Sequence, residues 1–179
     1  INLRKKYNLP INKKIVFFSA QDFSDKRKGY KIFIDIVNKL KNNRDLYFLS
    51  LGKNKYNFEG LYNLKQIDFL DHDKISDLYS LSDIFLCTSL IDNLPLTVLE
   101  ALSSGNVVFS MKNGGASEVL KGIGYTFKLG EKNKIINALI NLDKKKLKKK
   151  SLQSRKFALK NLTATNIKKQ YNDIFSNLI

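Results

Sequence analysis

The alternation of short apolar segments with segments of helical periodicity is the feature that most constrains how this chain can fold. Segments rich in β-branched and aromatic residues predict strands, and segments with apolar residues three and four positions apart predict helices between them. The predicted strands are residues 13–20, 45–52, 64–70, 83–90, 106–112 and 123–129. The predicted helices are residues 30–43, 73–82, 95–104 and 114–121, with helical periodicity continuing over residues 132–179.

Strands separated by helices need crossover connections, which make neighbouring strands parallel. We therefore predict the α/β class, as a Rossmann-like, doubly wound parallel sheet of about six strands that is closed by C-terminal helices. A length of 179 residues suits one domain. No apolar run approaches the roughly 18–20 residues that span a bilayer. The chain opens on Ile1 rather than on a methionine, so we expect it to be part of a longer protein.

A formal net charge of +16 is the largest anomaly of composition. It predicts attraction to anionic surfaces, without choosing among nucleic acid, lipid headgroups and phosphorylated ligands. Part of the excess lies in the run KKKLKKK, Lys144–Lys150. A solvated helical face is the first interpretation of this run, and binding to a membrane surface is the second. The single cysteine, Cys87, has no partner within the chain, which fits a reducing compartment.

Three loops of unusual composition follow predicted strands: SAQDFSDKRKGY, LIDNLPL and KNGGASE. They are expected at the carboxyl edge of the sheet, where open α/β sheets bind ligands. Pro95 suits the first turn of a helix, and Asn93 or its neighbour suits the cap. The backbone N–H groups of Leu96, Thr97 and Val98 are then expected to be free to bind phosphate.

Other residues of these loops complete a predicted diphosphate site. Gly114 and Gly115 would let a second backbone segment approach a ligand closely, at a helix start. Lys28, together with Arg27 and Lys26, supplies positive charge that is suited to neutralising a pyrophosphate.

Two carboxylates flank the phosphate-binding end of the predicted helix. Asp92 precedes the helix, and Glu100 lies about two turns into it. Each alone has an ordinary interpretation, Asp92 as a turn or cap residue and Glu100 as a half-exposed helical residue. Carboxylates are good acceptors for sugar hydroxyls, and a nucleotide-sugar carries hydroxyls on both sides of its diphosphate. The coincidence of these residues at one edge predicts a nucleotide-sugar site.

The order KG, then D-x7-E within DNLPLTVLEALSSG, then GGASEVL closely resembles the C-terminal, nucleotide-binding half of retaining GT-B glycosyltransferases of the glycosyl transferases group 1 type, family four. The resemblance covers nearly the whole chain, from the lead-in at Leu3–Pro10 to the terminal helices. It implies one Rossmann-like donor-binding domain over residues 1–179, half of a GT-B fold. It also implies that an N-terminal acceptor domain of the parent protein is absent from this chain.

The resemblance also implies roles for individual residues. Asp92 would touch the transferred sugar, Glu100 the donor ribose, and Lys28 the diphosphate. The family usually has glutamate where Asp92 stands and an arginine at the end of the first strand, so we expect Arg27 to supply the latter charge. Asp92, Lys28 and Arg27 thus form the implied catalytic set. The implied donor-binding set is Glu100, Leu96, Thr97, Val98, Asn93, Gly114, Gly115, Glu118, and the base-contacting Ile67, Phe69 and Leu70.

The function implied is transfer of a hexosyl unit, with retention, to a glycan or lipid-linked acceptor in cell-surface polysaccharide synthesis. The expected donor is a nucleotide-diphosphate sugar, with no separate cofactor, no metal and no nucleic-acid partner. We expect a cytoplasmic protein with peripheral contact at the anionic inner face of the membrane, and an isolated chain that binds nucleotide weakly without transferring sugar. The alternatives are a basic nucleic-acid- or membrane-binding module on an α/β scaffold, and a GT-B sugar-nucleotide epimerase or phosphorylase.

Overall fold

A computed structural model describes residues 2–53, 60–68, 70–112 and 114–176. Six parallel strands form one sheet in the order β3-β2-β1-β4-β5-β6, which confirms the predicted fold class. The strands are β1 (Lys14–Asp22), β2 (Leu46–Lys53), β3 (Leu64–Ile67), β4 (Ile84–Cys87), β5 (Val107–Met111) and β6 (Tyr125–Phe127). The chain therefore winds outward from β1 to β3, crosses to β4 and winds outward again.

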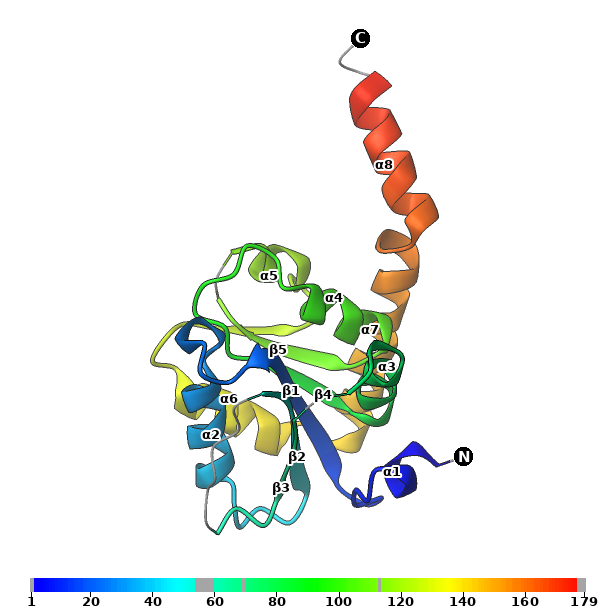
Figure 1. The fold of residues 1–179 in the computed structure, drawn as a ribbon. Helices are drawn as coiled ribbons and strands as arrows, with labels where there is room; N and C mark the ends of the chain where they lie inside the picture. The colour runs from blue at the N-terminus through cyan, green and yellow to red at the C-terminus, as the bar shows by residue number, and fades with distance from the viewer. Residues whose placement is uncertain (1, 54–59, 69, 113, 177–179) are drawn as a thin grey trace.

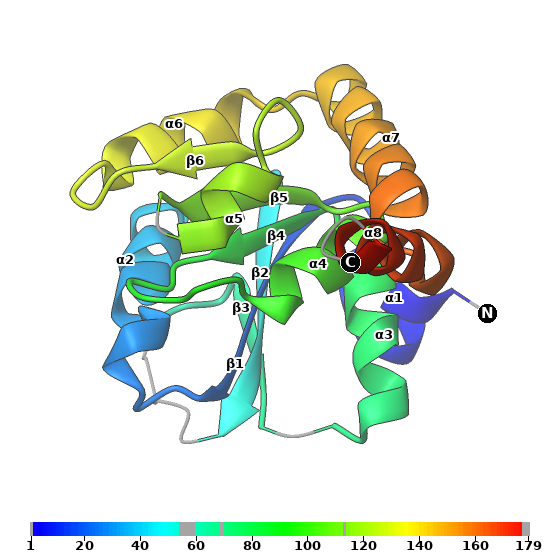
Figure 2. The same cartoon turned by 90° about the horizontal axis from the view of Figure 1, so that it is seen from above.

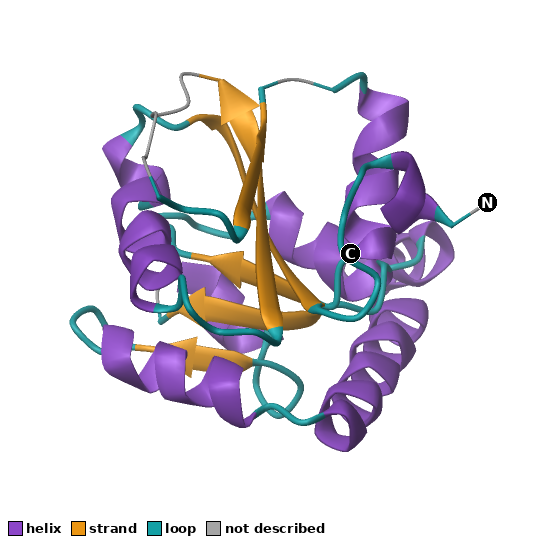
Figure 3. Ribbon diagram, turned by 90° about the horizontal axis from the view of Figure 1, so that it is seen from below, coloured by secondary structure: helices purple, strands orange, loops and turns teal. Residues whose placement is uncertain are grey.

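Helices cover both faces of this sheet (Figures 1 and 3). The helices are α1 (Leu3–Lys6), α2 (Tyr30–Lys39), α3 (His72–Leu81), α4 (Leu96–Ser103), α5 (Gly114–Val119), α6 (Lys132–Asn141), α7 (Lys144–Asn161) and α8 (Ala164–Ser176), with a 3₁₀ turn, η1, at Lys26–Lys28. Helices α2 and α6 pack on one face, and α3, α4, α5 and α7 pack on the other (Figure 2).

Burial on both faces explains the near-continuous apolar strands. In β1, Val16 and Phe18 belong to the core under α2 and α6, whereas Ile15 and Phe17 belong to the core under α3 and α4. All four side chains are at most 2% exposed. A strand that is covered on both faces needs apolar residues at successive positions rather than at alternate ones.

Several boundaries differ from those predicted. The third strand ends at Ile67 and not at residue 70, and α2 ends at Lys39 and not at residue 43. Helix α1 and turn η1 were not predicted, because pieces this short carry little periodicity. The C-terminal helical region consists of three helices, and α8 extends away from the sheet in Figure 1, with no buried residue among those described.

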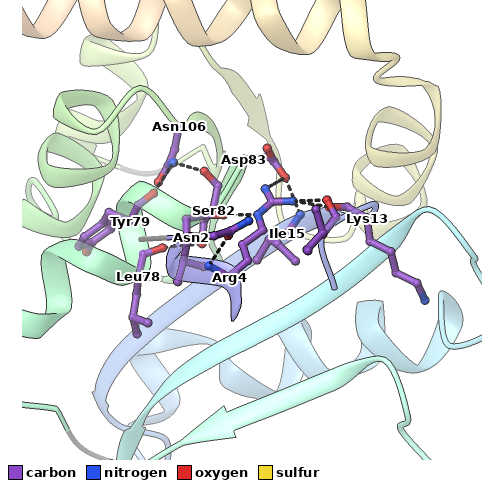
Figure 4. Close-up of polar contacts among 11 residues, drawn as sticks. Asn2, Arg4, Lys13, Ile15, Leu78, Tyr79, Ser82, Asp83 and Asn106 are labelled. Atoms are coloured by element: carbon purple, nitrogen blue, oxygen red, sulfur yellow. Dashed lines mark hydrogen bonds and ion pairs between the residues drawn. The ribbon is translucent and has the colours of Figure 1, made fainter. Parts of the chain in front are cut away.

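The amino edge of the sheet is tied together by a polar network (Figure 4). The Arg4 guanidinium donates to Asp83 Oδ2 at 2.8 Å and to the backbone carbonyls of Leu81 and Lys13 at 3.0 and 2.9 Å. Asp83 Oδ2 also accepts from the Ile15 N–H at 2.7 Å. This network fixes α1 across the starts of β1 and β4.

In the portion of the chain that the structure describes, no helix is long and apolar enough to cross a membrane. The six lysines of the run at residues 144–150 lie in the first two turns of α7, and most of them are exposed.

Candidate functional site

A pocket of about 800 Å³ opens at the carboxyl ends of β1 and β2, between α3 and α4. Its size lies within the range usual for small-molecule sites. It is lined by Ser19, Ala20, Gln21, Leu51, Gly52, Lys53, Asp68, Leu70, Asp73, Ile75, Ser76, Tyr79, Thr97, Glu100, Ser103 and Ser104. The pocket therefore lies at the edge where the parallel sheet was expected to bind a ligand.

Glu100 brings a carboxylate to the α4 side of this pocket. Its Oε2 accepts a hydrogen bond of 2.8 Å from the Tyr79 hydroxyl. Tyr79 is only 3% exposed, and its ring packs edge-on against Phe17 and against Phe85 at an intermediate tilt. Burial, reinforced by the Glu100 charge, raises the pKa of the Tyr79 hydroxyl far above its usual value. The phenol is therefore a permanent donor that fixes one oxygen of Glu100 and leaves the other for a ligand.

The predicted basic loop after β1 does reach the loop after β4. Lys28 Nζ lies 2.8 Å from Asp92 Oδ2, and their side chains are 35% and 17% exposed. The Leu90 N–H donates to the Arg27 carbonyl at 2.7 Å, and the Thr88 hydroxyl donates to the Gly29 carbonyl at 2.9 Å. Two residues of the predicted catalytic set are thus held together at the carboxyl edge.

Gly29 makes this close approach of the two loops possible. Its φ of 68° is left-handed, and a Cβ at this position would lie 2.0 Å from the Thr88 carbonyl oxygen. A larger residue would strain the backbone and push Lys28 away from Asp92. Glycine is therefore required after Lys28 so that the two loops can lie close enough for Lys28 to contact Asp92.

Arg27 is held differently from Lys28. Its guanidinium pairs with Asp25: Nε donates to Oδ1 at 3.1 Å, Nη2 donates to Oδ2 at 2.8 Å, and the Arg27 side chain is 69% exposed. The Arg27 hydrogen bond holds the pKa of Asp25 below its usual value. The predicted second cation is therefore neutralised by a neighbour two residues away.

The start of α4 differs in two respects from the prediction. Pro95 is the N-cap, not a residue of the first turn, and within the described part of the chain no side-chain hydrogen bond caps the helix there, from Asn93 or from Pro95. The Val98 N–H donates to the Pro95 carbonyl at 2.9 Å, and the Val98 side chain is fully buried. Val98 is therefore part of the core. Leu96 is 70% exposed, and Thr97 lines the pocket, so a phosphate-facing helix start is confined to these two residues.

The glycine pair brings two backbone segments of the protein together. The Gly115 N–H donates to the Asn93 carbonyl, and a Cβ on Gly114 would lie 2.3 Å from the Asp92 carbonyl oxygen. Gly114 also has a left-handed φ of 43°. The close neighbour of these glycines is thus the Asp92–Leu94 loop of the protein itself, and they place that loop against the start of α5.

The residues predicted near the base are divided by the structure. Leu70 lines the pocket, whereas Ile67 is partly buried against the core at the end of β3. Phe69 lies outside the described residues. Glu118 is exposed on α5 and is not among the residues that line the pocket.

Tyr79 is a residue of the pocket that sequence reasoning did not assign to the site. Its position in the apolar stripe of the helix at 73–82 indicated a core residue, and it is one. A buried phenol hydroxyl needs a hydrogen-bond partner, which was the available signal. The identity of that partner, 21 residues away on another helix, is not contained in the spacing.

The carboxyl edge offers a ligand three charged groups: the Glu100 carboxylate in the pocket, and the paired Lys28 ammonium and Asp92 carboxylate, which are not among the residues that line the pocket. In the described ranges, no three His, Cys, Asp or Glu side chains gather as metal ligands would. The fold and site together define a doubly wound α/β domain that matches one half of a GT-B glycosyltransferase.

Residues 1–158 match the family described as Glycosyl transferases group 1, and the chain belongs to this family. It is 27% identical to a glycogen synthase of Bacillus licheniformis over 142 residues, which are 70% of this chain and 29% of that protein. The chain therefore spans less than a third of that relative.

Solved structures agree on the fold. The sucrose-phosphate synthase of Thermosynechococcus elongatus matches 99% of this chain and 48% of its own, with a TM-score of 0.80 and 18% identity. The Anabaena protein HepE, solved in complex with UDP-glucose, matches 98% of this chain and 51% of its own, with a TM-score of 0.79 and 21% identity. At these identities the likeness concerns the fold.

Proposed function

We propose that this chain is the donor-binding domain of a retaining glycosyltransferase that takes a hexosyl unit from a nucleotide-diphosphate sugar. One observation carries the proposal: Glu100, which the family pattern places against the donor ribose, stands in the pocket of about 800 Å³ with one oxygen fixed by Tyr79. The free oxygen and the open pocket suit a pair of vicinal hydroxyls. That HepE was solved with UDP-glucose supports the same class of donor.

The proposed donor runs along α4. Its base lies at the part of the pocket lined by Asp68 and Leu70, and its ribose lies at Glu100. The diphosphate then reaches the start of α4 and Lys28, and the sugar lies at Asp92. This order follows the chain, because Asp92 precedes α4 and Glu100 lies within it.

Binding of the diphosphate would exchange one partner of Lys28 for another. In the structure, Lys28 is paired with Asp92 at 2.8 Å. When the Lys28 ammonium pairs with a phosphate, the Asp92 carboxylate becomes available to accept hydrogen bonds from the sugar hydroxyls. As the bond to the sugar breaks, negative charge grows on the leaving diphosphate, and a preorganised cation with helix-start amides stabilises it. Arg27 contributes to this only after leaving Asp25.

The acceptor is proposed to be a glycan or a lipid-linked glycan, bound largely by a further domain of the longer protein. The relative named glycogen synthase supports a glycan acceptor. We further propose a role in cell-surface polysaccharide synthesis and a cytoplasmic location with peripheral contact at the inner face of the membrane. No cofactor beside the donor is proposed.

Calorimetric titration of the 179-residue chain with UDP, GDP and their sugars tests the proposal. We expect one of the two nucleotides to bind, and Glu100→Ala to weaken that binding about tenfold or more, since a hydrogen bond to a charged group is lost. Glu131→Ala is the matched control, because it removes the same charge at the start of α6. Absence of binding by both nucleotides, or an equal loss in both variants, would contradict the proposal.

A further inference from the structure

Helix α7 concentrates positive charge more than any other part of the described chain. Its sequence, KKKLKKKSLQSRKFALKN, contains nine lysines and arginines in 18 residues and no acidic residue. A long helix of one charge repels itself, so its stability must come from packing on the rest of the domain. The donor site described above does not use this helix directly.

The two faces of α7 differ in composition. The inner face packs against α4 and β5 through small and apolar residues, with Ser154 and Ala158 buried. The outer face is exposed and consists of Lys145, Lys148, Lys149, Leu152, Lys156, Leu159 and Lys160. These seven residues are here called the lysine face. Figure 2 shows α7 at the side of the molecule, with its outer surface turned away from the sheet.

Two leucines interrupt the lysines of this face. Leu152 is 64% exposed and Leu159 is 54% exposed, and they lie two helical turns apart. Leu152 also lines a shallow groove of about 470 Å³, together with Lys145, Lys148, Lys149, Gln153 and Lys156. Apolar side chains held between lysines are typical of surfaces that enter the headgroup region of a bilayer.

The charge of the lysine face is not neutralised by the domain. In the ranges that the structure describes, an ion pair joins α7 to an acid at Lys146, whose Nζ lies 3.6 Å from Asp143. Lys150 donates to the Gly122 carbonyl, and Arg155 donates to the Ser103 carbonyl. These three cations lie beside the lysine face, and its own ammonium groups face solvent.

We propose that the lysine face is a docking surface for an anionic lipid bilayer. Lysines near a negatively charged leaflet are attracted within about a Debye length, and the exposed leucines add apolar contact that phosphates of a nucleic-acid duplex do not offer. The seven residues of the lysine face include no aromatic side chain on which a base could stack, and the amide of Gln153, which also lines the groove, is its one neighbour there able to read a base edge. Charge complementarity and the two leucines together favour the membrane over nucleic acid.

The helix that carries the lysine face packs directly against a helix that lines the donor pocket. Helix α7 packs against α4, and Arg155 reaches the carbonyl of Ser103, which lines the pocket together with Ser104. A bilayer bound to α7 would therefore lie one helix away from the donor site. This inference deepens the proposed membrane contact by naming its surface, and it does not depend on nucleotide binding.

Cosedimentation with lipid vesicles tests this docking surface. The 179-residue chain should bind vesicles of phosphatidylcholine mixed with phosphatidylglycerol, and should not bind vesicles of phosphatidylcholine alone. Lys145→Gln/Lys148→Gln/Lys149→Gln should lower affinity for the mixed vesicles by about a hundredfold, since each lysine near an anionic surface contributes roughly fivefold. The separate variant Leu152→Gln/Leu159→Gln should also lower affinity for the mixed vesicles. Its loss should be proportionally larger at high salt, where attraction between charges is screened and apolar contact contributes more of the binding.

The matched control is Lys31→Gln/Lys39→Gln/Lys41→Gln, which removes the same charge from exposed positions on and just after α2. Its affinity for the vesicles should change by less than about threefold, because those lysines lie on the opposite face of the sheet. Equal losses in both triple variants would overturn the proposal, and so would tighter binding to a DNA duplex than to mixed vesicles. Unchanged UDP or GDP affinity in the α7 variants separates this result from a failure of the donor site.

Discussion

Arg4 at the amino edge of the sheet and Lys28 at the carboxyl edge each contact an aspartate at 2.8 Å, but in different surroundings. Arg4 also donates to backbone carbonyls, and its partner Asp83 accepts a further backbone N–H (Figure 4). Lys28 has a side chain that is 35% exposed, and its contact to Asp92 joins two loops. The amino-edge pair is saturated by protein groups, whereas the carboxyl-edge pair retains capacity for a ligand.

The same contrast separates two other polar residues. Asn106, at the amino edge, is 1% exposed; its amide nitrogen donates to the carbonyls of Tyr79 and Ser82 at 2.9 and 2.8 Å, while its buried Oδ1 has no hydrogen-bond partner among the described residues. Glu100 accepts one bond from Tyr79 and stays exposed in the pocket. Polar groups that hold the sheet together are thus found at one edge, and polar groups available to a ligand at the other.

The largest effect is expected from breaking the amino edge. Asp83→Ala leaves the Arg4 guanidinium and the Ile15 N–H without their carboxylate, so the free energy of unfolding should fall by about 3 kcal/mol. Denaturant unfolding measures this. Asp71→Ala, which removes an exposed partner of Lys74, should change it by less than about 0.5 kcal/mol. Similar losses in the two variants would mean that the amino-edge network is not saturated as described.

Removal of the pocket carboxylate should have the opposite effect: little change in stability and a clear loss of nucleotide affinity. Glu100→Gln should leave the free energy of unfolding within about 0.5 kcal/mol of its original value, because the side chain is exposed. Nucleotide affinity, measured by calorimetry, should fall about tenfold. A large loss of stability with unchanged nucleotide affinity would mean that Glu100, like Asp83, stabilises the fold and does not bind the ligand.

Tyr79→Phe should have an intermediate effect on both properties. Loss of the hydroxyl removes one hydrogen bond, so unfolding should become easier by about 1 kcal/mol and nucleotide affinity should fall severalfold. Because the folded pKa of Tyr79 is raised, its contribution to stability is complete below the unfolded value of about 10 and is lost as the pH rises above it.

The Tyr79→Phe variant should therefore lose less stability than the original chain between pH ~10 and pH ~11. Thermal unfolding across this range measures the difference. Parallel curves for the two proteins would show that Tyr79 ionises normally.

The smallest effect is expected at Asp92. Asp92→Asn should raise the affinity for free UDP or GDP by up to about threefold, because Lys28 is released from a partly exposed pair worth less than about 1 kcal/mol. The same variant should weaken binding of the corresponding nucleotide-sugar relative to the free nucleotide. Calorimetry with both ligands makes the comparison. A loss of free-nucleotide affinity would mean that the sugar and ribose ends have been assigned the wrong way round.

Much of the fold could be predicted from the sequence. The apolar runs of β1, β2, β4 and β5 are long enough and apolar enough to read as strands buried on both faces. Their separation by amphipathic segments then required parallel pairing. The ends of helices and strands were less predictable, as β3 and α2 show. The residues just inside and just beyond an element's end are often of the same types, so the sequence does not mark the boundary.

The candidate site could be predicted as a set of loops and not as a set of contacts. The sequence indicated that Lys28, Asp92 and Glu100 belong to one edge of the sheet. It did not indicate that Lys28 and Asp92 pair with each other, or that Arg27 pairs with Asp25. Such pairs depend on loop conformations that are set by packing across the sheet, and the separation of 64 residues between Lys28 and Asp92 leaves no local pattern.

By itself, the sequence determined the parallel α/β sheet, the loops at its carboxyl edge and the basic character of α7, because hydrophobic periodicity and charge are local properties of the chain. Only the tertiary structure decided that Tyr79 fixes Glu100 and that Gly114 and Gly115 make room for the Asp92–Leu94 loop. The tertiary structure also decided which side of α7 is exposed to solvent. These outcomes depend on which distant segments come within a hydrogen bond or a van der Waals contact, and that is settled only when the layers pack.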